Sequence, residues 1–541
     1  MARSIGLDDA RPTPAHTLED GVDYVPTPRF YLFAQHFSAI AAAGPIAGPI
    51  IACQTFGWLP CLVWIALGVV LIGAVHDLAA LAASVRHRGR SIAEIVREHL
   101  GSRAGAAMMA FIWIALLYVI TAFADITAAT FVAGTDELRE TATTFNPGGA
   151  VAAASVMYLL LAVTLGLTQR FLRPPLWLVT VLFVPATIAL AWLGTHVSNL
   201  LVLPHRTWGL VILAYCGVAS LVPVWALLQP RGYLGGFVLY TALAIGLIGV
   251  LFGGYEILQP AFLTFDAGGM TGALFPFLFV TIACGACSGF HGLVASGTTS
   301  KQVARESHVH PIGYGAMLAE GFVALIALVT VMIASQEELK GLSPGTIYGN
   351  GIGRFLTLIV GEERRAFAIT LGAMAFSTFV FDTLDVCMRL GRYILQEMFG
   401  WKGLAGAVGG TIATGALPLY FLTLTPEGSW VRFWTLFGAS NQLLAGLSLL
   451  AITVWLARAR RRIAYTLVPM IFVLTITLWA LFKLALGNIR ASRGLDLELI
   501  NALTATVLIS LALYLAATAL ARVLAERQGG RGPAREPQPP S

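Results

Sequence analysis

Long uninterrupted apolar runs constrain the fold of this 541-residue chain more than any other feature of its sequence. A run of about 20 apolar residues is long enough to cross the hydrocarbon core of a bilayer as a helix. The run LVWIALGVVLIGAV, which begins at Leu62, is typical. It lacks the alternation of apolar and polar residues that the strands of an outer-membrane β-barrel require. About fourteen such runs are present, at 30–56, 58–85, 104–133, 150–168, 176–195, 208–228, 234–253, 272–299, 312–335, 366–388, 403–422, 430–456, 463–483 and 498–521. The sequence therefore predicts an all-α polytopic membrane protein with about 14 transmembrane helices.

Charged residues are too scarce for an ordinary soluble protein. They make up 11% of the chain, against about 25% in a typical soluble domain. If the N-terminus is cytoplasmic, 24 of the 34 Lys and Arg residues, Arg231 among them, fall in segments on the cytoplasmic side. Such a bias predicts orientation, so we expect both termini in the cytoplasm and one long outside loop at 336–365. The net charge of +6 then lies against anionic lipids and does not indicate a nucleic-acid partner.

The runs divide the chain into four parts. Residues 1–29 are polar, lack the apolar core of a signal peptide, and are expected to form a cytoplasmic tail. Residues 30–455 form the predicted core, and 456–522 supply accessory transmembrane helices. Residues 523–541 are rich in Gly, Pro and Arg and are predicted to be disordered. The six cysteines lie in or beside apolar runs, so we expect no disulfide framework.

Two of the apolar runs are poorly suited to a continuous helix. In the first run, Gly44-Pro45 and Gly48-Pro49 should open or kink the helix, because proline removes a backbone donor and clashes with the preceding turn. The eighth run mixes glycines with hydrogen-bonding residues: Gly285, Ser288, Gly289, His291, Gly292, Ser296, Gly297, Thr298 and Thr299. Two broken helices in opposite orientations predict an inverted repeat and a transport site. The alternative is that the glycines only permit close helix packing.

Ionisable groups within the apolar runs are the candidate coupling groups. They are His36, His76, Asp77, Asp125, His291, Glu320, Asp382 and Asp385. Charge at membrane depth is costly and usually functional, so these groups are candidates for proton or ion coupling. Structural alternatives stay open for each: a histidine bonded to a backbone carbonyl, an Asp77–Arg86 pair, an Asp385–Arg389 pair, or a carboxylate that only joins helices.

No metal site and no cofactor are predicted. The C-x-x-C-x-x-x-H spacing of Cys284, Cys287 and His291 lacks the four closed ligands of structural zinc, and small-residue packing explains it better. The chain contains no G-x-x-x-x-G-K-[ST] phosphate-binding loop, so ATP-driven transport by this chain is not expected.

Four ordered segments resemble the carbon starvation protein A (CstA) family over about residues 24–450. They are HFSAIAAAGPIAGPIIACQTFGWLP with GAVHDLAALAASVRHRGRSIAEI, TIACGACSGFHGLVASGTTSKQVARE with IGYGAMLAEGFVALIAL, TLDVCMRLGRYILQE, and LFGASNQLLAGLSL. The resemblance implies a bacterial inner-membrane transporter linked to carbon starvation, a fold of the amino acid–polyamine–cation transporter type, and pyruvate or peptides as substrates. It carries over to Gly44, Pro45, Gly48, Pro49, His36, Asp77, Ser288, Gly289, His291, Ser296, Gly297, Thr298, Thr299, Asp385, Asn441 and Gln442. Asp382 departs from the Thr or Ser that is usual there.

Together these features predict a proton-coupled uptake transporter for a small carboxylate such as pyruvate. The broken helices would bind the anion through free N–H groups. His291, Ser296, Thr298 and Thr299 would offer further hydrogen bonds, and Asp385 or His36 would take the coupling proton. The resemblance adds Asn441 and Gln442 to the expected substrate-binding residues. The alternatives are a peptide transporter and a membrane sensor that binds a metabolite without transporting it. An enzyme is not expected, because no nucleophile–base pair is evident. Sodium is an alternative coupling ion, lipids are the expected surroundings, and the sequence does not define an oligomeric state.

Overall fold

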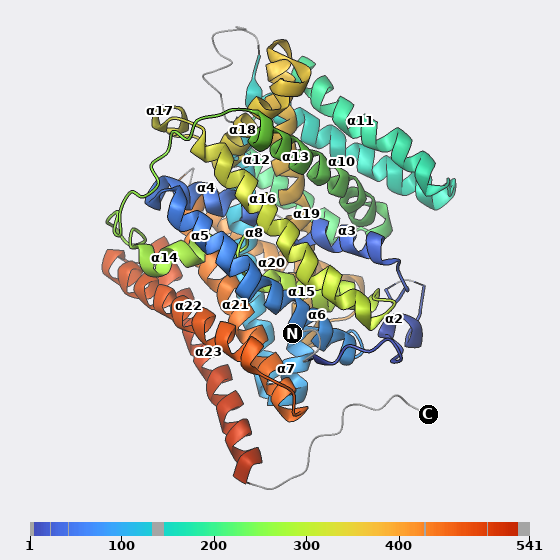
Figure 1. Cartoon of the computed structure of the whole chain (residues 1–541), viewed down its shortest axis with the longest axis vertical. Coiled ribbons are helices and arrows are strands. Elements are labelled where there is room, and N and C mark those ends of the chain that lie inside the picture. Colours follow the sequence, from blue (N-terminus) through green and yellow to red (C-terminus); the bar gives the residue numbers. More distant parts are fainter. Residues whose placement is uncertain are drawn as a thin grey trace.

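The computed structural model describes residues 5–21, 23–41, 43–132, 145–426, 429–494 and 496–528 (Figure 1). These residues are almost entirely helical, and the only strand-like pairings among them are two isolated bridges. The α-helices are α2 (Pro14–Thr17), α3 (Arg29–Ile40), α4 (Gly44–Phe56), α5 (Trp58–Gly68), α6 (Ala74–Arg86), α7 (Ile92–Leu100), α8 (Ser102–Val132), α10 (Pro147–Phe171), α11 (Leu176–His196), α12 (His205–Leu221), α13 (Leu228–Phe252), α14 (Leu274–Thr281), α15 (Gly289–Gly297), α16 (Gly315–Met332), α17 (Gln336–Leu339), α18 (Pro344–Val360), α19 (Arg365–Phe399), α20 (Gly403–Leu424), α21 (Trp430–Arg458), α22 (Ala464–Ala491) and α23 (Leu497–Gln528). Short 3-10 and π segments join some of them: η1 (Val69–Gly73), η2 (Val224–Ala226), η3 (Thr299–Lys301), η4 (Glu306–His308), η5 (His310–Tyr314) and η6 (Glu362–Arg364). The predicted all-α polytopic architecture is confirmed.

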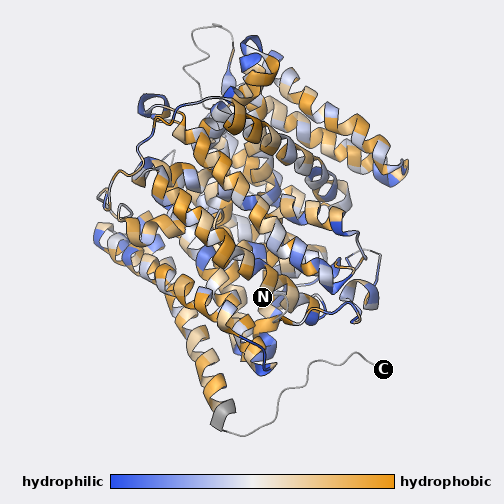
Figure 2. Cartoon of the chain, viewed as in Figure 1, coloured by the Kyte–Doolittle hydropathy of each residue, from blue (hydrophilic) through white to orange (hydrophobic). Residues whose placement is uncertain are grey.

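The number of membrane spans is smaller than predicted. Eleven helical stretches in the described part of the chain are long and apolar enough to cross a membrane, and the bent pair α3 and α4 adds a twelfth. Each predicted apolar run coincides with a helix or a helix pair, but α12 has only 17 residues and the run at 272–299 is divided between α14 and α15. The count of fourteen is therefore not confirmed. Figure 2 shows apolar residues along the helices and hydrophilic residues gathered mostly at helix ends and connections.

The segment 336–365, predicted as a long outside loop, is mostly helical, and the side of the membrane on which it lies stays a prediction. α18 begins with Ser343 as N-cap and Pro344 in its first turn, a favourable start for a helix. Its glycines allow α19 to approach closely: a Cβ on Gly349 would lie 2.8 Å from the Cβ of Ala373. The Gly, Thr, Asn and Arg residues of α18 lower its hydropathy, and a search for apolar runs therefore misses it.

Helices α19 and α21 form the centre of the bundle. The most apolar window of α21 is 100% buried and that of α19 is 94% buried, against 17% for α11 and 22% for α23. Figure 1 shows α10 and α11 at one edge of the bundle and α22 and α23 at another. The prediction of disorder from residue 523 is wrong for 523–528, where α23 continues to Gln528. The rest of that tail, 529–541, lies outside the described residues.

The first predicted helix break is present, although only one of the two Gly-Pro pairs marks it. α3 ends at Ile40, α4 begins at Gly44, and the two helices are bent by 44°. Pro45 lies in the first turn of α4, where a missing N–H does no harm, whereas Pro49 lies inside the helix without ending it. Gly48 allows backbone contact, because a Cβ there would lie only 2.6 Å from the carbonyl oxygen of Thr281.

The second predicted break separates α14 from α15, and residues 282–288 between them are not α-helical. A break inside the bilayer leaves carbonyl groups that lipid cannot hydrogen-bond. Helix α21 supplies donors to two of them. Trp434 Nε1 donates to Thr281 O at 3.2 Å, and Gln442 Nε2 donates to Phe279 O at 3.3 Å. The predicted broken helix is therefore stabilised by a continuous neighbour.

The two breaks face each other. A Cβ on Gly44, the first residue of α4, would lie 2.3 Å from Cys284 Sγ in the second break. A Cβ on Gly285 would lie 2.9 Å from the Cβ of Ala324 and 3.5 Å from Pro45 Cα. Glycines at these positions therefore let the two interrupted helices touch where both are unwound. The inverted repeat that would relate them stays a prediction.

Four segments far apart in sequence meet on what we call the N-terminal face. They are residues 5–28, the α6–α7 connection, residues 298–309 and the α21–α22 connection. Asp8 N donates to Glu306 Oε2 at 2.7 Å, and Arg86 Nε donates to Glu306 Oε1 at 2.5 Å. Arg86 thus pairs with Glu306, whereas Asp77 contacts His76 and His291. The described part of the predicted N-terminal tail is packed against the helical core.

Candidate functional site

A buried cluster of acidic and histidine side chains lies beside the second break. We call Asp77, His76, His291 and Glu320 the histidine–carboxylate cluster. Asp77 accepts from both histidines, with His76 Nδ1 2.7 Å from Oδ1 and His291 Nδ1 2.8 Å from Oδ2. His291 Nε2 lies 3.0 Å from Glu320 Oε2 in an ion-pair contact. All four residues are buried, with at most 1% exposure.

Three helices position this cluster. His76 and Asp77 lie in the first turn of α6, just after the π segment η1, whose wider turn reorients the following residues. His291 lies in the first turn of α15, after the break, and Glu320 lies in α16. Gly292 makes room for His76, since a Cβ there would lie 3.2 Å from His76 Cε1. The break therefore brings a short half-helix against two longer helical stretches.

The surroundings of His291 favour a proton on this cluster. Both of its ring nitrogens lie near carboxylate oxygens, and a neutral imidazole has only one N–H. His291 Nε2 and Glu320 Oε2 are within ion-pair distance but not in hydrogen-bond geometry, and neither has another hydrogen-bond partner among the described residues. A proton on His291 or on Glu320 would relieve the repulsion between these two atoms. Its loss would place an imidazole lone pair against a carboxylate and leave two buried, poorly compensated charges.

His36 lies in a second contact on the other broken helix. Its Nδ1 is 2.9 Å from Oγ1 of Thr299, which begins η3 just after α15, and both residues are buried. Its Nε2 has no hydrogen-bond partner among the described side chains, which also holds for His76 Nε2, His291 Nε2 and both carboxylate oxygens of Glu320. Unsatisfied buried groups of this kind mark positions that a ligand, an ion or water would satisfy.

Asn441 closes the N-terminus of α15. Its Oδ1 accepts from Phe290 N at 2.9 Å, and its amide and Ser288 Oγ lie 3.0 Å apart. Asn441 Nδ2 also contacts Cys284 Sγ at 3.2 Å. Gly289 allows α21 this close, because a Cβ would lie 2.4 Å from Asn441 O. The predicted pair Asn441 and Gln442 therefore serves the second break directly, one residue on each side of it.

The remaining predicted residues of α15 lie at its other end. Ser296 Oγ donates to Gly292 O and accepts from Ile92 N at 3.2 Å, which ties α15 to the start of α7. Thr298 Oγ1 donates to Val294 O, and Gly297 has open space around it. These residues contact the N-terminal face and are separate from the histidine–carboxylate cluster.

Asp382 and Asp385 belong to a different cluster, which the sequence did not reveal. Both bind Arg231 of α13: Nε donates to Asp382 Oδ1 at 2.5 Å and Nη1 to Asp385 Oδ2. Tyr215 also donates to Asp385 Oδ2, at 2.8 Å. We call Arg231, Asp382, Asp385 and Tyr215 the arginine cluster. Arg231 is 0% exposed, so its assignment to a cytoplasmic loop was wrong.

Asp385 and Arg389 do not pair with each other, as the structural alternative had it. Arg389 Nη2 instead donates to the carbonyls of Ala219 and Val222 at 2.7 Å, where it caps the end of α12. Such capping satisfies carbonyls that have no partner within the helix. The partner of Asp382 and Asp385 is therefore Arg231, not Arg389. The i, i+3 spacing of the acidic pair is the signal that could have prompted a search for it.

Asp125 is separate from both clusters. Its Oδ1 lies 3.2 Å from Nε2 of His205, the first residue of α12, which is also 3.2 Å from Asp125 O. The contact joins α8 to the start of α12, as the structural alternative for a lone carboxylate anticipates. His205 was not a sequence candidate, because it lies just before its apolar run.

The fold and cluster together define a class of protein. A polytopic helical membrane protein in which two helix breaks meet near buried titratable groups has the layout of a secondary transporter. The family model described as "Carbon starvation protein CstA" matches residues 1–350 and 339–480. The chain therefore belongs to the carbon starvation protein CstA family, and it is a CstA-type transporter rather than an enzyme.

Curated relatives match most of the chain. The peptide transporter CstA of Campylobacter jejuni is 33% identical over 87% of this chain and 75% of its own length. The peptide transporter CstA of Bacillus subtilis is 33% identical over 87% of this chain and 85% of its own. The pyruvate/proton symporter BtsT of Escherichia coli is 32% identical over 88% of this chain and 77% of its own length. A solved manganese transporter of Eremococcus coleocola matches at 12% identity and a TM-score of 0.47, over 94% of this chain and 99% of its own.

Proposed function

We propose that this chain takes up a small carboxylate such as pyruvate together with protons. The observation that carries the proposal is the position of His291, which bridges Asp77 and Glu320 beside the second helix break. That arrangement favours one proton on His291 or Glu320, and a transporter that binds and releases this proton on opposite sides couples uptake to the proton gradient. The relative named pyruvate/proton symporter supports the same assignment.

The substrate carboxylate would bind at the start of α15. Helix N-termini attract anions through free N–H groups and the helix dipole. In this structure Asn441 Oδ1 takes the N–H of Phe290. A carboxylate would replace that oxygen, and Asn441 Nδ2 and Ser288 Oγ would donate to it. Gly44 and Gly48 in the first break would keep the facing wall close.

The coupling proton would reside on His291 or Glu320, with Asp77 and His76 orienting the ring. Asp382 and Asp385 stay candidate coupling groups, but their contacts with Arg231 favour a structural role. Sodium coupling through carbonyls near Gly44–Pro49 is the competing proposal. We further propose that the protein lies in a bacterial inner membrane with the N-terminal face in the cytoplasm, because most Lys and Arg residues fall on that side.

The experiment is uptake of labelled pyruvate into vesicles that contain the purified protein, with an imposed inward proton gradient. We expect accumulation that depends on the gradient and disappears with a proton ionophore. A sodium gradient at constant pH is the matched control. Uptake that follows sodium, or no uptake, would overturn the proposal. Binding without flux would instead support the sensor alternative.

Peptide transport is the second candidate, because seven relatives of 32–34% identity carry the name peptide transporter. A dipeptide presents an N-terminal ammonium as well as a carboxylate, and Glu320 with its unpartnered Oε1 could accept from an ammonium. Competition by dipeptides and tripeptides against labelled pyruvate separates the two candidates. Competition at low peptide concentration together with peptide flux would favour peptides as the physiological substrate.

A further inference from the structure

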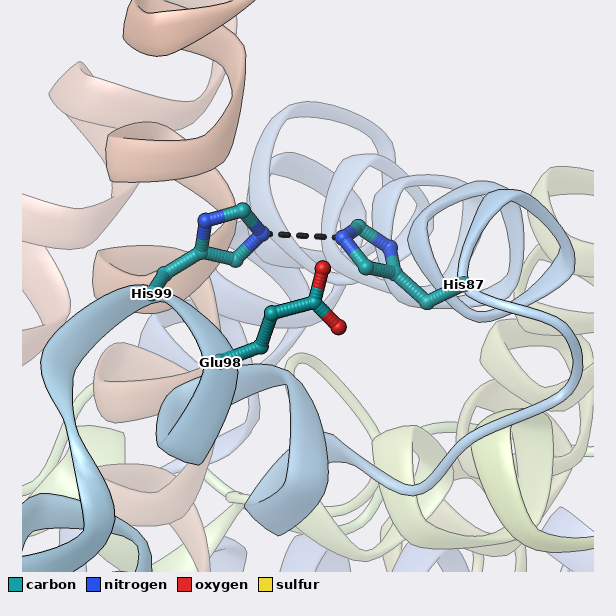
Figure 3. A group of neighbouring side chains, drawn as sticks. All are labelled: His87, Glu98 and His99. Atoms are coloured by element: carbon teal, nitrogen blue, oxygen red, sulfur yellow. Dashed lines mark hydrogen bonds between the residues drawn. The ribbon is translucent and has the colours of Figure 1, made fainter. Parts of the chain in front are cut away.

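The proposed transport mechanism leaves one cluster of titratable side chains on the N-terminal face unused. It contains His87, Glu98 and His99, which come from two segments joined by a short connection (Figure 3). His87 is the C-cap of α6, and Glu98 and His99 lie in the last turn of α7. One ligand atom from each residue lies within 4.8 Å of the others. In Figure 3, one Glu98 carboxylate oxygen points toward the gap between the two imidazole rings.

The helix geometry holds these side chains in place. A capping box starts α7: Ser91 Oγ accepts from Glu94 N at 3.3 Å, and Glu94 Oε2 accepts from Ser91 N at 3.2 Å. Gly101, at a φ of 102°, ends the helix directly after the last turn. His87 Nδ1 donates to Ala83 O at 2.6 Å, which fixes the tautomer and directs the Nε2 lone pair toward His99. A backbone carbonyl on the second nitrogen is the usual support of a metal-binding histidine.

Both rings are neutral in this arrangement. Arg458 Nη1 can only donate to His99 Nδ1, so His99 carries its hydrogen on Nε2 and shares it with His87 Nε2 at 2.8 Å. Neutral imidazole is the form that ligates metals, and a metal can take the place of a hydrogen shared between two ring nitrogens.

We propose that His87 Nε2, His99 Nε2 and the Glu98 carboxylate bind a divalent transition metal of the zinc class. Two imidazoles and one carboxylate are a ligand set that zinc accepts, with a fourth position open to water. Nitrogen ligands disfavour magnesium and calcium. Tetrahedral zinc places two ligand nitrogens about 3.3 Å apart. The rings would therefore separate by roughly half an ångström, and the hydrogen of His99 would move to Nδ1.

That hydrogen shift displaces Arg458 from the ring but leaves it a partner. Arg458 Nη1 also donates to His99 O at 3.0 Å, and this bond does not depend on the ring. Arg90 is the competing cation, because its Nη1 holds Glu98 Oε2 at 3.0 Å. Arg90 is largely exposed, so removing its charge should strengthen metal binding without disturbing the fold.

A metal here would act on the moving parts of the proposed transporter. α6 carries Asp77 near one end and His87 at the other. Ser84, one turn before His87, contacts Ser300 Oγ at 2.8 Å, and Ile92 N donates to Ser296 Oγ. Joining α6 to α7 would therefore hold the far end of α15, and zinc would slow transport. This consequence rests on the proposed function, whereas metal binding itself does not.

The test measures zinc binding to the full-length purified protein by titration calorimetry. We expect one Zn²⁺ per chain, and affinity reduced at least about tenfold by His87→Gln or His99→Gln. Glu98→Gln tests the exposed ligand and should also weaken binding. Arg90→Gln should tighten binding roughly two- to fivefold. The matched control is His196→Gln, an exposed histidine whose hydrogen bonds are with Trp192 and Thr195 of its own helix, α11.

The outcomes are distinguishable. Weakening by the three ligand variants and tightening by Arg90→Gln would support the site. The absence of saturable zinc binding, or an affinity unaffected by all four variants, would overturn it. If zinc inhibits uptake by the wild type but not by Glu98→Gln, this would support the proposal that bound zinc slows transport. If binding is present but transport is unaffected, the site stands and only its action on transport fails.

Discussion

The histidine–carboxylate cluster and the arginine cluster are both buried, but they are built from opposite kinds of groups. In the first, every member gains or loses its charge with a proton. In the second, Arg231 is permanently charged and faces Asp382 and Asp385. The difference lies in the cation: a histidine can be discharged inside the membrane, whereas an arginine cannot.

The two clusters also differ in the helices that they join. His291 lies on the short half-helix α15, next to an unwound segment, and bridges α6 and α16. Arg231 joins α13 to α19 and contacts Tyr215 of α12, and all three are continuous helices. A cluster at a helix break can rearrange when the half-helix moves. The comparison indicates that the first cluster works during transport and that the second holds the helices together.

The largest expected effect is the loss of stability in Arg231→Met. Removing one partner of a buried ion pair leaves uncompensated charge and costs about 3–5 kcal/mol. We expect the variant to melt far below the wild type in detergent, or not to yield folded protein. The triple variant Arg231→Met, Asp382→Leu and Asp385→Leu removes all the charges and should recover most of the lost stability. If the triple variant is as unstable as the single one, uncompensated buried charge is not the cause of the lost stability.

The second effect concerns transport. Asp77→Asn keeps the size of the side chain but removes the negative charge that two histidines face. We expect proton-driven uptake to fall by about 100-fold or more, as when a positioned proton-transfer group is lost. The melting temperature should change much less than in Arg231→Met. Near-normal uptake in Asp77→Asn would contradict the assignment of the first cluster to coupling.

The third variant, Glu320→Gln, imitates a permanently protonated carboxyl group. A pH gradient of one unit can drive accumulation by about tenfold when one proton moves with each substrate. We expect this accumulation to be lost, while exchange of labelled for unlabelled pyruvate without a gradient continues. The measurement compares accumulation and exchange in the same vesicles. Accumulation that still follows the gradient would exclude Glu320 as the proton carrier.

The sequence predicted the broken helices well because their signals are local. Gly44-Pro45 and the glycines around Gly289 act on the backbone at the positions where they occur. It also singled out His291, Asp77 and Glu320, since charge inside an apolar run is conspicuous. It could not show that the three meet, because Asp77 and His291 are 214 residues apart and depend on tertiary packing.

The sequence failed where a residue's role depends on distant partners. Arg231 lies three residues before the apolar run at 234–253 and was therefore assigned to a loop, although it belongs to α13 and pairs with Asp382 and Asp385 inside the bundle. Helix α18 was missed because glycines that allow close packing against α19 also lower its hydropathy. In both cases the residues are stabilised inside the bundle by tertiary contacts, and composition alone does not identify the contacting residues.

The smallest expected effect is that of Asp382→Asn, and it tests the charge balance within the arginine cluster. Arg231 faces two carboxylates, so the cluster carries one excess negative charge when both are ionised. Asparagine retains an oxygen for Arg231 Nε, and Asp385 still holds Nη1. We therefore expect a melting temperature close to that of the wild type and an uptake rate within about twofold of it. The matched variant Asp385→Asn should be worse, because Asp385 accepts from both Arg231 and Tyr215. A large transport defect in Asp382→Asn with unchanged stability would contradict the comparison, since it would place a coupling proton in the arginine cluster.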